Sequence, residues 1–273
     1  MPTSTSSHRR HVRRSAGALL LLSALAGGCA ANAETGTVST APILVKDGTL
    51  TVCTDIPYEP FEFMQKGKPA GFDVELVDKV AARLDLKSKI VDTDFDAIQS
   101  GEALNSDKCD VAISAMTITG DRARVLDFSS PYFNASQALV MEAGTSVNEL
   151  SDLAGKKIGV QGGTTGELYV TDNAPDSADI VPFEDSAAMD TALEKGDVDA
   201  AVYDNTVVGD VVANNPGLAV AAEFDTGEQY GMAVKKDGNV NLLLTINDVI
   251  ADLKKDGGYD KLFATWFGDA PGA

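Results

Sequence analysis

The side chains with the clearest chemical potential in this 273-residue chain follow short, β-rich runs. They are Asp55 and Tyr58 after 49–54, Ser114 and Thr117 after 111–113, Gln161, Thr164 and Thr165 after 157–160, and Asp204 after 198–203. Arg122 and Phe95 lie close in sequence to such strand ends. In open α/β sheets, ligands bind beyond the carboxyl ends of strands, so we expect these side chains to meet at one site.

Their types suit a small dipolar molecule. Arg122 is a bidentate partner for a carboxylate, and the Gly162–Thr165 turn feeds a helix whose free N–H groups also hold anions. Asp204 can accept hydrogen bonds from an ammonium group. Tyr58 and Phe95 could hold a flat or aliphatic ligand side chain between them, and Asp55 could accept from the polar tip of that side chain. Taken singly, Arg122 also fits a solvated helix start, Asp204 an N-cap and Phe95 a core residue. Together the set predicts a site for a free amino acid.

Composition excludes several classes of function. The two histidines, His8 and His11, lie in the first eleven residues, so without that segment the chain has no imidazole for Ser-His-Asp, Cys-His or His-ligated zinc chemistry. With 22 Lys and Arg against 41 Asp and Glu, the net charge of -19 also argues against nucleic acid as a partner. We expect no metal and no cofactor.

The N-terminus has the features of an export signal. Four arginines between 9 and 14 precede the apolar run 16–26, which is too short to span a bilayer comfortably. Gly27, Gly28 and Cys29 resemble a lipobox, although position 26 is Ala where Leu is usual; the alternative is an ordinary secretory signal. We expect a signal peptide at 1–28, a lipidated Cys29, and a flexible, lipid-anchored tether over 29–47. The protein is then exported and attached to the cell membrane by its lipid.

Cys53 and Cys109 are the other two cysteines. Outside the cytoplasm they are free to oxidise, and each belongs to a strand-like run. They form a disulfide if these strands are neighbours, and two buried thiols otherwise.

The remaining sequence alternates strands and helices, which predicts an α/β fold with predominantly parallel sheets. We expect strands at 49–54, 89–91, 111–115, 138–142, 157–161, 180–183, 198–203 and 232–234. We expect helices at 72–86, 95–104, 147–153, 166–173, 186–195, 205–214, 239–256 and 259–267. The pattern restarts after 142 and returns to a strand near 232, which favours two lobes with the first completed by the C-terminus.

Seven motifs in order resemble the polar amino acid-binding proteins of ABC transporters, the bacterial solute-binding family 3. They are TDIPYEPFEF at 54–63, GFDVELVDKVAARL at 71–84, DFDAIQSG at 94–101, CDVAISAMTITGDRARVLDFSSPYF at 109–133, DLAGKKIGVQGGTTGE at 152–167, VDAAVYDNTVV at 198–208 and DGGYDKLFATWFG at 256–268. The similarity covers about 48 to 268 and, as an ordered set, is highly specific.

The resemblance implies a periplasmic-binding-protein type II fold with a two-strand hinge. Lobe 1 is expected over 46–136 plus 231–273 and lobe 2 over 137–230, with crossings at 135–141 and 228–233. It implies that Cys53 and Cys109 lie on adjacent strands, which favours the disulfide. It also implies a monomer that binds an amino acid without chemistry and delivers it to a transporter permease.

The resemblance also assigns roles at matching positions. Arg122, in the ITGDR stretch, is expected to bind the ligand carboxylate, with N–H groups at Thr164 and Thr165; Asp204 binds the α-ammonium. Ser114, Ala115 and Thr117 offer backbone and hydroxyl contacts, although Ala115 stands where some members have Ser. Tyr58 and Phe95 form the aromatic pair.

The choice of amino acid stays open between arginine or lysine and glutamine. Apart from Arg122 no matched position is basic, and Gln161 stands where some glutamine binders carry Lys, so acidic ligands are disfavoured. Asp55, together with Glu59, leans the choice toward cationic ligands. The alternatives to a transport protein are a same-fold enzyme, of the cyclohexadienyl or prephenate dehydratase type, and a surface sensor lipoprotein.

Overall fold

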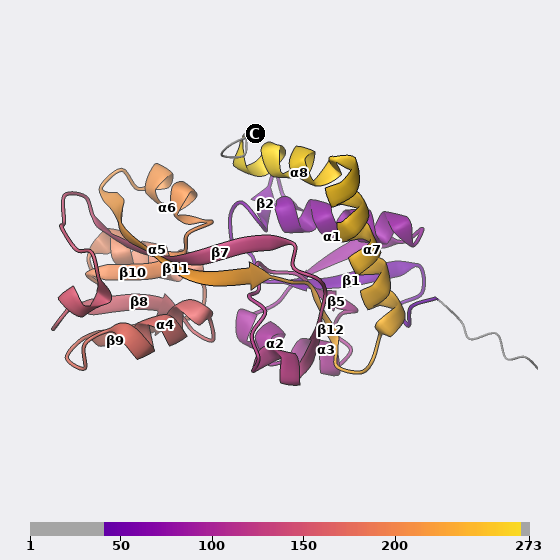
Figure 1. Ribbon diagram of the computed structural model, residues 1–273, viewed down its shortest axis with the longest axis horizontal. Helices are drawn as coiled ribbons and strands as arrows, with labels where there is room; N and C mark the ends of the chain where they lie inside the picture. Colours follow the sequence, from indigo (N-terminus) through magenta and orange to yellow (C-terminus); the bar gives the residue numbers. More distant parts are fainter. Residues whose placement is uncertain (1–40, 269–273) are drawn as a thin grey trace, which may run out of the picture. The chain divides into compact units, whose positions relative to one another are not determined.

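The computed structural model describes residues 41–268, and the predicted signal peptide, Cys29 and most of the tether lie outside them. Within this range the strands form two five-stranded sheets and one hairpin, with helices against the sheets (Figure 1). The α/β fold predicted from the alternation of strands and helices is confirmed, and its two large sheets each combine parallel and antiparallel strands.

The first sheet combines strands from both ends of the described chain. Its order is β4 (Lys87–Asp92), β1 (Thr49–Thr54), β5 (Val111–Ala112), β12 (Ala233–Lys235) and β6 (Leu126–Phe128). β1 pairs in parallel with β4 and β5, whereas β12 is antiparallel to β5 and β6. The return of the chain to this sheet at β12 agrees with the late strand expected near 232.

The second sheet has the same plan. Its order is β11 (Leu218–Tyr230), β7 (Phe133–Glu142), β10 (Ala200–Asp204), β8 (Lys157–Gln161) and β9 (Asp179–Phe183). β8, β9 and β10 are parallel, and β7 is the strand that runs against its neighbours. In each sheet, therefore, one strand of the five is reversed.

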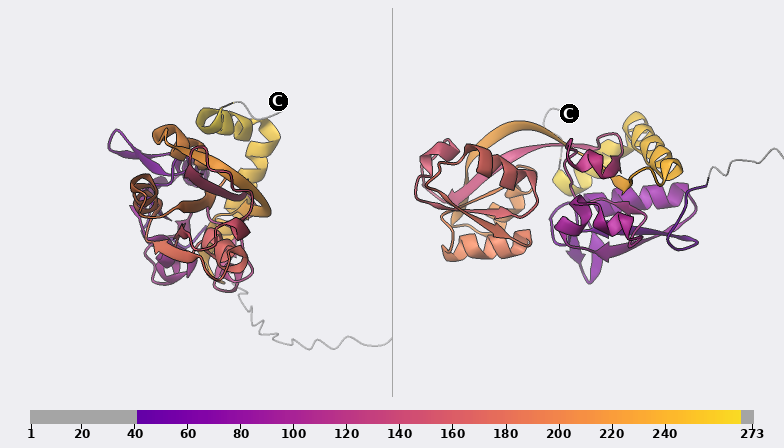
Figure 2. Two further views of the ribbon diagram at one scale, coloured as in Figure 1. Left: turned by 90° about the vertical axis from the view of Figure 1, so that its left-hand side faces the viewer. Right: turned by 90° about the horizontal axis from the view of Figure 1, so that it is seen from below.

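Two long paired strands connect the two sheets. β7 and β11 pair antiparallel from Glu142↔Leu218 to Phe133↔Tyr230, and Figures 1 and 2 show them running from the second sheet toward the first. Phe61 anchors their ends, because its ring centroid lies 5.0 Å from that of Phe133 and 5.4 Å from that of Tyr230. The lobe boundaries at 136/137 and 230/231 stay predictions.

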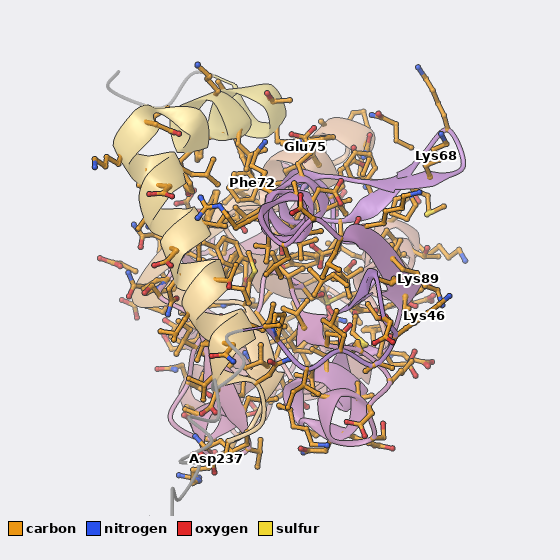
Figure 3. All side chains as sticks on the ribbon, turned by 90° about the vertical axis from the view of Figure 1, so that its right-hand side faces the viewer. Lys46, Lys68, Phe72, Glu75, Lys89 and Asp237 are labelled. Atoms are coloured by element: carbon orange, nitrogen blue, oxygen red, sulfur yellow. A yellow bond between two sulfur atoms is a disulfide. The ribbon has the colours of Figure 1, made fainter. Side chains whose placement is uncertain are left out.

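Helices cover the first sheet on the side seen in Figure 3. α1 (Phe72–Arg83) packs against α7 (Val240–Asp256) and α8 (Gly258–Phe267). α1 has Asp73 and Glu75 in its first turn, where carboxylates favour the helix dipole, and Leu76, Val77 and Val80 are buried. The predicted amphipathic face is thus observed, although the helix ends at Arg83 rather than at 86.

The other helices lie close to the predicted ranges, with some breaks. They are α2 (Phe95–Gln99), α3 (Glu102–Asn105), α4 (Thr165–Asn173), α5 (Ser186–Lys195) and α6 (Val208–Asn214), with 3-10 turns at Arg122–Arg124 and Leu150–Asp152. The single helix expected over 95–104 is wrong, because Gly101 adopts a left-handed φ of 79° that ends one helix and starts the next. The helix expected over 147–153 is reduced to the short 3-10 turn.

The strands also differ from the prediction. The strand expected over 111–115 stops at Ala112, because the chain turns there and Ala115 takes a φ of 41°. The hairpin of β2 (Phe63–Gln65) and β3 (Lys68–Ala70), together with β6, was not expected. Most of β11 was also missed, since its first half is rich in alanine and has one β-branched residue, Val220.

The end of the predicted tether is held by hydrogen bonds to Asn239 and Asp110. The backbone N–H of Ile43 donates to Asn239 Oδ1 at 3.2 Å, and Asn239 Nδ2 donates to the Ile43 carbonyl at 2.6 Å. The N–H of Val45 donates to Asp110 Oδ1 at 2.6 Å. A flexible tether over the whole of 29–47 is therefore wrong at its C-terminal end.

Cys53 and Cys109 form the disulfide that was expected. Cys53 lies on β1, and Cys109 lies two residues before the neighbouring strand β5, with a Cα–Cα distance of 5.7 Å. Both residues are buried in the core beneath α2 and α3. The bond therefore fixes β1 and β5, the two strands that Asp55 and Ser114 follow.

Replacing both cysteines with alanine is expected to lower the free energy of unfolding by about 4 kcal/mol, because a crosslink between residues 56 apart restricts the unfolded chain. Urea unfolding of the oxidised protein and of the variant measures the difference. The oxidised protein treated with a reducing agent is the control and should unfold like the variant. Equal midpoints for all three samples would contradict a stabilising disulfide.

Candidate functional site

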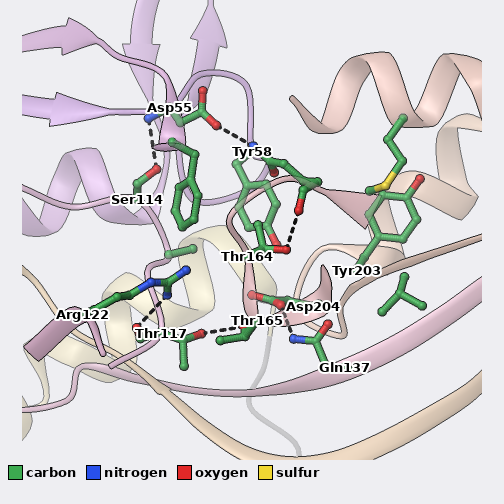
Figure 4. Close-up of a pocket in the computed structure, with 16 residues that line it drawn as sticks. Asp55, Tyr58, Ser114, Thr117, Arg122, Gln137, Thr164, Thr165, Tyr203 and Asp204 are labelled. Atoms are coloured by element: carbon green, nitrogen blue, oxygen red, sulfur yellow. Dashed lines mark hydrogen bonds between the residues drawn. The ribbon is translucent and has the colours of Figure 1, made fainter. Parts of the chain in front are cut away.

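A cavity lies where the strand ends of the two sheets face each other (Figure 4). All eleven residues that the sequence predicts for the site line it: Asp55, Tyr58, Phe95, Ser114, Ala115, Thr117, Arg122, Gln161, Thr164, Thr165 and Asp204. Gln137, Gly166, Met189, Val202 and Tyr203 line it as well and were not predicted. Glu59 does not line this cavity; it is exposed and faces a separate groove beside Asp210, so its suggested role is wrong.

The strands explain why these residues meet. Asp55 follows β1 and Ser114 follows β5, its parallel neighbour in the first sheet. Gln161 ends β8 and Asp204 ends β10, which are parallel neighbours in the second sheet. Parallel strands end at the same edge of a sheet, so each sheet brings its own pair to the cavity.

Arg122 is a buried cation, 5% exposed. Its Nη1 donates to the carbonyl of Thr117 at 2.8 Å, and its Nη2 donates to the carbonyl of Gly163, across the cavity, at 2.9 Å. Burial lowers the pKa of Arg122 to about 10, while the negative charges of Asp204 and Glu228 raise it, so the group stays protonated at neutral pH. Among the described residues, no carboxylate is in ion-pair contact with this guanidinium.

Phe95 packs against Arg122. The guanidinium carbon of Arg122 lies 5.1 Å from the centroid of the Phe95 ring, within the range of a cation–π contact. Phe95 therefore supports the charge of Arg122, and Tyr58, the other member of the expected aromatic pair, also lines the cavity. The pairing of the two rings around a ligand side chain stays a prediction.

The Gly162–Thr165 turn offers fewer free N–H groups than expected. The N–H of Gly162 donates to the Phe183 carbonyl at 2.9 Å, and that of Gly163 donates to Glu167 Oε2 at 2.8 Å. The N–H groups in the first turn of a helix have no intrahelical acceptor, and α4 begins at Thr165. The N–H groups that can meet an anion are therefore those at the start of α4, next to the Gly163 carbonyl that Arg122 binds.

Asp204 is a buried carboxylate, 9% exposed, with two donors. Its Oδ1 accepts from Gln137 Nε2 at 2.7 Å, and its Oδ2 accepts a short hydrogen bond from the Tyr230 hydroxyl. Burial raises the pKa of Asp204 to about 6, and the charge of Glu228 adds to the rise. A cation at this position would stabilise the ionised form.

Asp55 lies at the other end of the cavity from Arg122 and Asp204 (Figure 4). Its Oδ2 accepts from Gln161 Nε2 at 2.8 Å. This hydrogen bond joins the end of β1, in the first sheet, to the end of β8, in the second sheet. Burial raises the pKa of Asp55 to about 7, and the nearby carboxylates of Asp92, Asp185 and Asp94 raise it further. This end of the cavity is therefore short of positive charge.

The hydroxyl groups of the predicted site already have partners. Ser114 Oγ donates to Glu62 Oε1 at 2.6 Å and accepts from the Asp55 N–H at 3.0 Å. Thr117 and Thr165 both donate to Glu228 Oε2, at 2.7 and 2.6 Å. Thr164 donates to the Gln161 carbonyl at 2.8 Å. These side chains shape the cavity, and what they can still offer a ligand is mainly backbone N–H and C=O groups.

Two buried acids behind the site were missed from the sequence. Glu62 and Asp73 are both 0% exposed, and Asp73 Oδ2 accepts from the Ala115 N–H at 2.8 Å and the Tyr132 hydroxyl at 2.7 Å. Burial raises the pKa of both groups, that of Asp73 to about 7, and the charge of Asp73 raises the pKa of Glu62 further. They hold Ser114 and the left-handed Ala115 in place. The one feature of the sequence that could have indicated their burial is that both acids have apolar residues on each side.

The chain matches the model of the bacterial extracellular solute-binding proteins, family 3, over residues 50–269. It belongs to this family. The resemblance seen in the seven motifs is thereby confirmed, and in this family the chain acts as a binding protein and not as an enzyme.

Two curated relatives and two solved structures illustrate the range of the family. The L-cystine-binding protein TcyJ of Escherichia coli (strain K12) is 35% identical over 81% of this chain and 83% of its own length. A probable histidine-binding protein of Neisseria gonorrhoeae is 32% identical over 85% of this chain and 88% of its own. An ancestral arginine-binding protein bound to arginine is 43% identical, with a TM-score of 0.77, over 81% of this chain and 99% of its own. An ancestral arginine-binding protein bound to glutamine is 42% identical, with a TM-score of 0.77, over 82% of this chain and 100% of its own.

Two further features concern the described residues as a whole. No helix between 41 and 268 is long and apolar enough to cross a membrane. In the same range, no group of His, Cys, Asp and Glu side chains is arranged to hold a metal ion.

The raised carboxyl pKa values predict that the ligand-free protein loses stability as the pH rises. Asp55, Asp73 and Asp204 hold their protons up to about pH 6 to 7 in the folded state, against about 3.8 in the unfolded chain. The folded protein binds more protons in this window, so the free energy of unfolding falls between about pH 4 and 7. Urea unfolding at several pH values measures it.

Asp204→Asn provides the comparison, because it removes one of these groups and should flatten the profile between about pH 4 and 6. Acids with lowered pKa values, such as Asp127 and Asp199, change stability only below this window. A wild-type profile that rises with pH and matches that of the variant would contradict the prediction.

Proposed function

We propose that this protein binds a free amino acid with a cationic side chain, arginine first, and delivers it to the permease of an ABC importer. Arg122 binds the α-carboxylate together with N–H groups at the start of α4, Asp204 binds the α-ammonium, and Asp55 binds the charged tip. The other predicted site residues complete the walls. The observation that carries the proposal is the charge of the cavity.

The charges that line the cavity complement such a ligand. Among its described lining residues, Arg122 is the one basic side chain, whereas Asp55 and Asp204 are both acidic. A ligand with one carboxylate and two cationic groups therefore neutralises the site, and a neutral side chain leaves Asp55 unpaired. The charges of Asp92, Asp94 and Asp185 around Asp55 disfavour an acidic ligand there.

Glutamine is the second candidate, for a specific reason. Asp55 has a pKa of about 7, and below that pH its protonated carboxyl group can donate to an amide oxygen. The ancestral arginine-binding protein solved with glutamine supports the idea that one such site accepts both ligands. We expect arginine to gain over glutamine as the pH rises.

Binding is expected to favour the closed arrangement of the two predicted lobes, 46–136 plus 231–273 and 137–230. Contacts between the two sides of the cavity include Arg122 to the Gly163 carbonyl, Gln161 to Asp55, Thr117 to Glu228, and the Ser186 hydroxyl to the Pro57 carbonyl at 2.9 Å. A ligand that bridges Arg122 and Asp204 adds contacts that exist only when both sides meet, which shifts the population toward closure. Lipidation at Cys29 would keep the protein near its permease.

Arg122→Ala is expected to weaken binding of every amino acid by about 30-fold or more, because removal of one partner from a buried charge pair costs at least about 2 kcal/mol. Isothermal titration calorimetry measures this loss. Arg124→Ala is the matched control, since Arg124 lies in the same 3-10 turn but is exposed and pairs with Asp121. Equal affinities for the wild type and the Arg122 variant would remove Arg122 from the site.

Asp55→Asn should separate the two candidate ligands. We expect it to weaken arginine binding by about 10- to 100-fold, the usual worth of a hydrogen bond to a charged group, and to leave glutamine binding nearly unchanged. Calorimetry at pH 8 with arginine, lysine, histidine, glutamine and cystine measures both effects. Asp47→Asn is the control, because Asp47 is exposed and does not line the cavity. A wild-type protein that binds none of the five at millimolar concentration would overturn the proposal.

A further inference from the structure

Gln137 lines the cavity from an element that carries none of the predicted site residues. It lies on β7, directly opposite Asp204 of β10 in the antiparallel register, so the two side chains share one face of the sheet. Gln137 is 0% exposed. An amide buried this completely is costly unless its donors and its acceptor are satisfied.

The nitrogen of the Gln137 amide is fully engaged. Nε2 donates to Asp204 Oδ1 at 2.7 Å and to Glu228 Oε1 at 2.9 Å, which uses both of its hydrogens. These two bonds also fix the orientation of the amide, because a flipped amide would turn its oxygen toward two carboxylate oxygens. Figure 4 shows the nitrogen facing Asp204 and the oxygen pointing away from that carboxylate.

The oxygen of the same amide has no partner. Gln137 Oε1 is buried and receives no hydrogen bond from the described residues. It lies beside Gly166 at the start of α4, where a side chain would cover it: an added Cβ would come within 3.0 Å of Oε1. Gly166 also lines the cavity, so no side chain at position 166 separates this oxygen from the cavity.

The other buried polar atoms without a hydrogen-bond partner among the described residues are not candidates for binding the ligand. They belong to Thr54, Glu62, Asp73 and Trp266, and none of these four residues lines the cavity. The two acids are accounted for by the proton they hold between them, as their raised pKa values indicate. Gln137 Oε1 is therefore the unsatisfied acceptor that faces the binding site.

We infer that Gln137 is a further ligand-binding residue, and that its Oε1 accepts a hydrogen bond from the α-ammonium of the bound amino acid. An ammonium group has three donors, and Asp204 can accept only those that point toward it. The carbonyl of Gln137 provides a second, neutral acceptor at a fixed angle to the carboxylate. The pair therefore recognises a primary amine by two acceptors, whereas Asp204 alone would recognise positive charge.

The inference rests on the proposed function only in that the ligand is an α-amino acid. It does not depend on which side chain the ligand carries, because Gln137 lies with Asp204 and not with Asp55. It also gives Glu228 a role: by binding Gln137, Thr117 and Thr165 it holds the amide in the orientation that exposes Oε1.

The test compares two ligands in two proteins. Calorimetry measures the affinities of arginine and of 5-guanidinopentanoate, which is arginine without its α-amino group, for the wild type and for Gln137→Met. We expect the variant to weaken arginine binding by about 10- to 100-fold and the des-amino ligand by less than about threefold, since only arginine donates to Oε1. Gln229→Met is the matched control, because Gln229 lies on β11 but is exposed and does not line the cavity.

A crystal structure of the wild-type protein with arginine separates direct contact from mere positioning of Asp204. We expect the α-nitrogen within about 3.2 Å of Gln137 Oε1, as a normal hydrogen bond requires. A separation beyond hydrogen-bonding distance overturns the inference, whether or not the variant folds. If the wild type binds arginine and Gln137→Met binds it equally well, this inference alone is overturned. If the wild type binds no amino acid, both this inference and the proposed function are overturned.

Discussion

The buried guanidinium of Arg122 is the constraint on which the site depends. A buried cation is costly unless it is paired, and here its observed partners are two backbone carbonyls and the face of Phe95. Carbonyl dipoles support the charge without neutralising it, so the site retains a strong preference for an anion. The same group also ties the two sides of the cavity together through Gly163. Recognition of a carboxylate and closure of the cavity are therefore two consequences of one buried charge.

The acids around the cavity favour a cationic group on the ligand. Burial raises the pKa values of Asp55 and Asp204 toward neutrality, so without a ligand each holds its charge only weakly at neutral pH. An ammonium or guanidinium group would return both to the ionised state, and the binding free energy then includes the release of protons. Glu228 behaves differently: burial opposes its charge, but donors from Thr165, Thr117, Gln137 and Thr226 outweigh burial and lower its pKa. It is a permanent anion that organises its neighbours, whereas Asp55 and Asp204 are completed by the ligand.

The sequence predicted those parts of the site that follow a general rule of the fold. Asp55, Ser114, Gln161 and Asp204 come at strand ends, and parallel strands bring such residues together whatever the details of packing. Gln137 was not predicted because it lies in the middle of β7, a reversed strand that crosses between the sheets. Its position is set by the register of β7 with β10. The helix break at Gly101 was not predicted for a similar reason. The turn is fixed by tertiary contacts, since a Cβ at this position would meet the Val125 carbonyl at 3.2 Å. Periodicity reports which face of an element is buried, but it does not report which neighbour lies against that face.

The two sheets place their reversed strands in corresponding positions, and this arrangement explains why the unpredicted residues cluster. In each sheet three parallel strands lie to one side, the reversed strand follows, and an edge strand completes the five. In the second sheet the reversed strand is β7 and the edge strand is β11, which are also the two connections to the first sheet. Side chains on them, such as Gln137 and Glu228, contact residues from both sides of the cavity without belonging to any strand end. Residues of the connecting strands can therefore link the state of the ligand to the relative position of the two sheets, because they touch the site and the hinge at once.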